Sequence, residues 1–85
     1  MTGRPLEAVA AYEAMVSDHP ASAGGYVTLA EAYEAVGQLQ AAVSAYQRAV
    51  ALNPSWQGPS AEEAGQLADS RRWDKAAAAY RAIVR

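Results

Sequence analysis

Apolar residues recur along the chain at three- and four-residue steps, and the stretches that carry them are separated by short polar breaks with proline or glycine. The clearest stretch runs from Leu39 to Leu52 and contains neither proline nor glycine. Its apolar residues fall on one face of a helix: Ala42, Ala45, Tyr46, Ala49 and Val50. Asn53 and Pro54 are expected to end the helix, because proline disfavours helical geometry in the residue before it.

The preceding stretch, Ala23 to Val36, has the same spacing, with Tyr26, Leu29, Ala30 and Tyr33 on one face. Ser22 is placed to cap its first turn. Gly37 is placed to end it, because glycine enters the left-handed conformation without steric cost. Two helices joined by so short a turn are expected to lie antiparallel.

The whole pattern predicts five helices, at about Leu6–Asp18, Ala23–Val36, Leu39–Leu52, Ala61–Ser70 and Trp73–Val84. Pro59-Ser60, with Glu63 three residues further on, predicts a capping box at the start of the fourth helix. The stretch Asn53–Pro59 contains two prolines, a glycine and a serine, and it is predicted to be a loop.

The sequence also matches itself at an offset of 34 residues, and a fixed period of this length is typical of stacked supersecondary units. The matching sets are Ala8, Ala11, Tyr12 and Val16; then Ala42, Ala45, Tyr46 and Val50; then Ala76, Ala79, Tyr80 and Val84. Gly3 pairs with Gly37, Pro20 with Pro54, and Ala30 with Ala64.

The middle unit resembles a tetratricopeptide repeat. The family pattern of large, small and turn residues is met at ten positions: Tyr26, Leu29, Ala30, Tyr33, Gly37, Leu39, Ala42, Tyr46, Ala49 and Pro54. The resemblance implies one all-α domain over residues 1–85, a right-handed stack of antiparallel helix pairs. Its parts are a half repeat at 3–20, a full repeat at 23–54 and a divergent repeat at 57–85. In the divergent repeat Ser60 replaces the leading aromatic residue and Glu63 replaces the leucine, which leaves the packing of the fourth helix open.

Composition narrows the function further. The chain has 85 residues, no cysteine and a net charge of −2, so disulfides and thiolate metal sites are excluded and no basic footprint for nucleic acid is present. No apolar run is long enough to span a membrane, and the first residues lack the apolar core of a signal peptide. We therefore expect a cytoplasmic protein. Whether the chain is a complete gene product stays open.

No constellation of catalytic residues is visible. His19 is the one histidine and is expected at a helix end, Glu62 and Glu63 are adjacent and so point in different directions, and no serine lies in a nucleophile motif. Metal sites need several converging ligands, and none converge here. We therefore predict a protein that is not an enzyme, with no catalytic residue, no metal and no cofactor.

The family resemblance implies that the first helix of each repeat lines a concave groove. This places Gly24, Val27, Thr28, Glu31 and Glu34 on the groove from the middle unit, and Ala61, Glu62, Gly65 and Asp69 from the third. The groove would be lined by small residues and acidic, with no basic residue interleaved. We therefore expect it to bind a cationic or apolar peptide or helix of a partner protein.

Two alternatives remain open. The chain could be a self-assembling structural element, since Val9 and Tyr12 on the first helix and Ala79 and Ile83 on the last are expected to lack a covering neighbour. Homo-oligomers through these terminal helices would then form. It could also be a non-catalytic domain detached from a larger enzyme.

Overall fold

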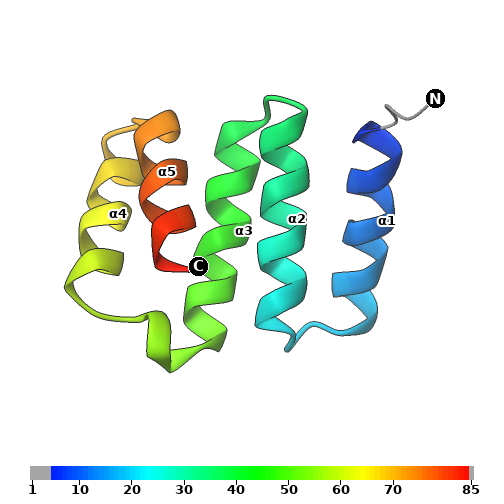
Figure 1. Cartoon of the computed structure of the whole chain (residues 1–85), viewed down its shortest axis with the longest axis horizontal. Helices are drawn as coiled ribbons and strands as arrows, with labels where there is room; N and C mark the ends of the chain where they lie inside the picture. Colours follow the sequence, from blue (N-terminus) through cyan, green and yellow to red (C-terminus); the bar gives the residue numbers. More distant parts are fainter. Residues whose placement is uncertain (1–4, 85) are drawn as a thin grey trace.

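The computed structural model describes residues 5–84, and this part of the chain is all-α. Its elements are α1 (Pro5–Asp18), α2 (Ala23–Ala35), α3 (Leu39–Leu52), the 3-10 helix η1 (Pro54–Trp56), α4 (Pro59–Asp69) and α5 (Trp73–Ile83). Consecutive α-helices run in opposite directions (Figure 1). The five predicted helices are therefore confirmed, with boundaries that differ by at most two residues.

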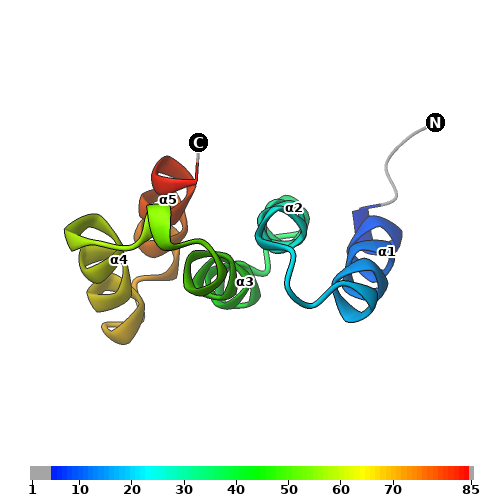
Figure 2. The ribbon, with the colours of Figure 1, turned by 90° about the horizontal axis from the view of Figure 1, so that it is seen from below.

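The helices do not follow one another in space in chain order. Along the longest axis of the molecule the order is α1, α2, α3, α5, α4 (Figure 1). Seen at right angles to this view, α2 and α5 lie on one side of the layer, and α1, α3 and α4 lie on the other (Figure 2). Since the directions alternate along the chain, α3 and α5 are parallel neighbours.

The ends of α2 follow the sequence prediction. The Ser22 hydroxyl accepts a hydrogen bond of 3.0 Å from the Gly25 backbone N–H, as an N-cap does. At the other end Gly37 has φ +80°. The Gly37 N–H donates to the Glu34 carbonyl and the Gln38 N–H to the Tyr33 carbonyl, which is the Schellman pair of bonds.

The start of α4 differs from the prediction. The capping box is wrong, because the N-cap is Gly58 at φ 144°, with no side-chain cap, and Ser60 lies inside the helix. Pro59 takes the first helical position, where its fixed φ and missing N–H cost nothing, so α4 begins two residues earlier than expected.

The predicted loop after α3 contains the 3-10 turn η1. The Asn53 side chain accepts a bond of 3.0 Å from the Ser55 N–H, and the Gln57 amide donates to the Val50 carbonyl at 3.1 Å. Trp56 is half-buried against the core. The stretch is thus held in place at both of its ends.

The core is built mainly from alanine and tyrosine at the repeat positions. Ala30, Ala42, Tyr46 and Ala49 are all 0% exposed, so these repeat positions lie where the helices pack against one another. Val9 is only 7% exposed, so the expectation that it lies uncovered on the outer side of the first helix is wrong. Tyr12 is half-buried.

The third unit docks through its second helix. The α5 helix packs along α3, whereas α4 barely touches α3. The Tyr46 and Tyr80 rings stack with centroids 6.1 Å apart, and the Gln47 amide donates to the Tyr80 hydroxyl at 3.3 Å. In a regular stack of repeats α4 would pack on α3, as α2 packs on α1. Here α5 takes that place, so the divergent sequence of the fourth helix is accompanied by different helix neighbours.

Candidate interaction site

The structure divides the predicted groove into two separate parts. Gly24 and Glu31 are exposed and Val27 and Thr28 are half-buried, all on α2. Ala61, Glu62, Gly65 and Asp69 lie on α4, with α3 and α5 between the two helices (Figures 1 and 2). A single groove lined by both sets therefore does not form, because α5 takes the place next to α3 that the prediction gave to α4.

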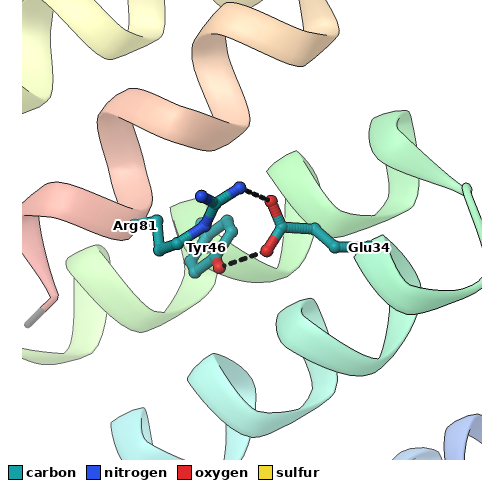
Figure 3. A network of polar contacts seen from close by, with 3 residues as sticks. All are labelled: Glu34, Tyr46 and Arg81. Carbon is teal, nitrogen blue, oxygen red and sulfur yellow. Dashed lines mark hydrogen bonds and ion pairs between the residues drawn. The ribbon is translucent and has the colours of Figure 1, made fainter.

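Glu34 also differs from its predicted role as a free groove acid. Its carboxylate contacts Tyr46 of α3 and Arg81 of α5 (Figure 3). Arg81 Nη2 of α5 is 2.6 Å from Glu34 Oε2, and the Tyr46 hydroxyl donates to Glu34 Oε1 at 2.8 Å. We call these three residues the clasp. The prediction that no basic residue is interleaved is wrong here, because Arg81 neutralises Glu34.

The electrostatics of the clasp favour the bound arrangement. Burial, with the hydrogen bond to Glu34, raises the pKa of Tyr46 well above its ordinary value of 10. The hydrogen bond to Glu34 raises the pKa of Arg81. The Glu34 side chain is 14% exposed and the Arg81 side chain 41% exposed. The clasp thus joins the third unit to the middle repeat.

A surface hollow lies between α2 and α3. It has a volume of about 360 Å³ and we call it the tyrosine hollow. Its lining is mostly apolar and aromatic, and consists of Tyr26, Leu29, Tyr33, Ala41, Ser44, Ala45 and Arg48. Sequence reasoning assigned the two tyrosines to the core and did not identify a hollow between them.

Two polar groups border this hollow. The Arg48 guanidinium carbon lies 5.5 Å from the centre of the Tyr26 ring, a distance at which a cation interacts with an aromatic face. The Tyr33 hydroxyl donates to the Glu13 carboxylate of α1. That hydrogen bond, with a contribution from burial, raises the pKa of Tyr33 to about 12.

Another hollow, of about 720 Å³, is shallow and lies where α3 and α5 begin. It is lined by Leu39 and Trp73, which the sequence placed at the turns, and by Gly37, Gln38, Gln40, Ala41 and Ser44. Its lining is more mixed than that of the tyrosine hollow. It separates the starts of the two parallel helices.

Three kinds of feature are absent from the described residues. Within residues 5–84, no group of three or more His, Cys, Asp or Glu residues could hold a metal ion. No buried side-chain nitrogen or oxygen in this range lacks a hydrogen-bond partner. No helix in the described range is long and apolar enough to cross a membrane.

Comparison with known proteins identifies the middle of the chain. A family model described as tetratricopeptide repeat matches residues 23–56, the unit formed by α2, α3 and η1. No curated protein and no solved structure gives a significant match. The match starts at the first residue of α2 and covers the ten pattern positions and the observed helical hairpin. Residues 23–56 of the chain are therefore similar to a tetratricopeptide repeat.

Proposed function

We propose that the chain is a non-catalytic protein-interaction module that binds an apolar segment of a partner protein in the tyrosine hollow. Tetratricopeptide repeats in general mediate protein–protein interaction. The observation that carries the proposal is the coincidence of this hollow with the matched repeat: all seven lining residues lie between residues 23 and 56.

The lining suits a protein ligand. Tyrosine contributes a large apolar surface with a polar tip, and it is enriched among the residues that dominate binding energy at interfaces. The hollow is in the lower part of the size range of ligand pockets, and so fits one or two apolar side chains. Arg48 at the rim can donate hydrogen bonds to a carbonyl or carboxylate of the bound segment.

The α2 face with Gly24, Val27, Thr28 and Glu31 is a second surface on the same helix. Glu34 is paired with Arg81, and the acids of α4 lie on another part of the molecule. Among the described residues, Glu31 is therefore the acid on this α2 face that forms no ion pair. We propose binding of a cationic segment there only as the alternative to the tyrosine hollow. Because this face has one such acid, its preference for cationic over anionic peptides should be weaker than that of a groove lined by four acids.

The two surfaces can be separated experimentally. We would select binders from a displayed library of 16-residue peptides and measure their affinities by fluorescence anisotropy. Ser44→Trp fills the tyrosine hollow from an exposed position, and Glu31→Gln is the control on the α2 face. We expect apolar peptides whose affinity falls at least tenfold with Ser44→Trp and is unchanged with Glu31→Gln. The opposite pattern would favour the α2 face, and failure to enrich any peptide would contradict a peptide-binding function.

A further inference from the structure

We propose that the groove between α4 and α5 is a second docking site, and that it binds an amphipathic helix of a partner protein with a small-residue stripe and a central Lys or Arg. We call this groove the furrow; it is lined by Ser60, Glu63, Leu67, Ala79, Ala82 and Ile83. The proposal rests on the proposed function as an interaction module, but concerns a different surface and a different ligand.

The furrow is the tyrosine hollow repeated in the next unit. An offset of 34 residues takes five residues that line the hollow to five that line the furrow. The pairs are Tyr26 with Ser60, Leu29 with Glu63, Tyr33 with Leu67, Ala45 with Ala79, and Arg48 with Ala82. The two surfaces therefore occupy the same place on their helical hairpins.

In the middle unit, a helix contacts part of this face, and the tyrosine hollow stays open beside it. The α1 helix packs on α2, with the Met15 and Val16 side chains next to Gly25. Glu13 of α1 accepts the hydrogen bond of Tyr33. Leu29 is consequently only 5% exposed. The molecule itself thus shows that a helix can lie on this type of face.

In the third unit the corresponding face is open. Ser60 and Glu63 are exposed, and Leu67, Ala79 and Ile83 are half-buried. In this unit α5, and not α4, lies beside α3 (Figure 2). The furrow of about 320 Å³ shares Glu63 and Leu67 with one neighbouring hollow, and Ser60 and Ile83 with another. It is therefore continuous along the 11-residue helix α4, roughly 16 Å.

The charges define the ligand. Glu63 lines the furrow, and Arg72 lines the neighbouring hollow that shares Glu63 and Leu67 with it. Neither side chain forms an ion pair among the described residues. A helix that carries a cation opposite Glu63 and an acid near Arg72 would therefore be oriented by charge. The apolar residues of the furrow are Leu67, Ala79, Ala82 and Ile83, and they accept an apolar stripe. Residues 5–18 contain no Lys or Arg, so α1 of a second copy does not supply this cation.

The test uses two helix-stabilised 14-residue peptides that carry an Ala/Leu stripe and differ at one central position, Lys or Glu. Their binding to the full chain is followed by fluorescence anisotropy. We expect the Lys peptide to bind at least tenfold more tightly, and Glu63→Gln to reduce this preference at least fivefold. Ala82→Trp should abolish binding, whereas Arg48→Trp, the equivalent substitution in the tyrosine hollow, should not. Circular dichroism checks that both tryptophan variants fold.

Other outcomes would overturn the proposal. Equal binding of the two peptides would remove the charge argument. Loss of binding with Arg48→Trp instead of Ala82→Trp would move the ligand to the tyrosine hollow. A concentration-dependent mass in sedimentation that Ala82→Trp abolishes would show a second copy in the furrow. The peptide library tests the tyrosine hollow, and the Lys and Glu peptides test the furrow. Either experiment can therefore fail without deciding the outcome of the other.

Discussion

The clasp offers the most direct test of how the third unit is attached. If the Glu34–Arg81 pair holds α5 against the middle repeat, the two side chains must be energetically coupled across 47 residues of sequence. A double-mutant cycle with Glu34→Gln, Arg81→Gln and the double variant isolates this coupling from the other effects of each substitution. Gln keeps similar size and hydrogen-bonding capacity and removes the charge.

The expected magnitude follows from the exposure of the pair. Fully exposed ion pairs contribute about 0.2–1 kcal/mol, and hydrogen bonds to charged groups in proteins about 1.5–3 kcal/mol. With the Glu34 side chain 14% exposed and the Arg81 side chain 41% exposed, screening by water is substantial. We expect a coupling of about 1–1.5 kcal/mol, between the two ranges. Total stability for a chain of this length is roughly 4–13 kcal/mol, so the effect is measurable.

Urea unfolding followed by circular dichroism gives the free energies of the four proteins. The cycle is repeated at 1 M salt, where the screening length falls to about 3 Å, and the coupling should decrease. Glu31→Gln combined with Arg81→Gln serves as the control, and its coupling should be clearly smaller because the ion pair of Arg81 is with Glu34 and not with Glu31. A Glu34–Arg81 coupling below about 0.3 kcal/mol at low salt would refute the role of the clasp.

Three further predictions follow. Ala42→Leu should destabilise the protein by about 1–3 kcal/mol in urea unfolding, since Ala42 is 0% exposed and an added side chain overpacks the core; an unchanged midpoint would contradict this. Arg71 has φ 62°, at the position equivalent to Gly37, so Arg71→Gly should stabilise by about 0.5–1 kcal/mol and Gly37→Arg should destabilise by about as much. Tyr33, with its pKa raised to about 12, keeps its proton in the folded state between pH 10 and 12, so its contribution to stability is present below pH 10 and is lost as pH rises through 12. Tyr33→Phe should remove one tyrosine component near pH 12 from the absorbance titration at 295 nm, and an identical curve would contradict the assignment.

The sequence was sufficient to predict the helices, because each has a strong local signal. Periodic apolar residues define α3, and Ser22 and Gly37 mark the ends of α2. The start of α4 was missed because Ser60 and Glu63 match a capping box, while Pro59 fits the first turn equally well. These two start signals lie within two residues of each other. Which of them sets the first residue of the helix depends on the loop that precedes it.

The candidate site was predicted less well, because it depends on which helices are neighbours. The α2 residues were placed on one helix correctly. They would form one groove with the α4 residues only if α4 packed on α3, as in a regular stack of repeats. Glu34 was identified as a groove acid, and its partner Arg81 could not be found from sequence spacing, since the two lie in different repeats. The tyrosine hollow was missed because a repeat pattern marks Tyr26 and Tyr33 as packing residues and does not show the space left between them.

The change of neighbours at α3 has an explanation in the two substitutions that weaken the third repeat. In the middle unit, Tyr26 and Leu29 give α2 large apolar groups on the face that meets α1, and both are buried. Their equivalents on α4 are Ser60 and Glu63, which would be placed against α3 in a regular stack, at the cost of burying a carboxylate. In contrast, α5 retains Ala76, Ala77 and Tyr80, which are at most 3% exposed, and Arg81 adds the ion pair with Glu34. The apolar face of α5 therefore competes more effectively for α3, and the polar face of α4 turns toward solvent, where Glu63 stays hydrated until a cationic partner reaches it.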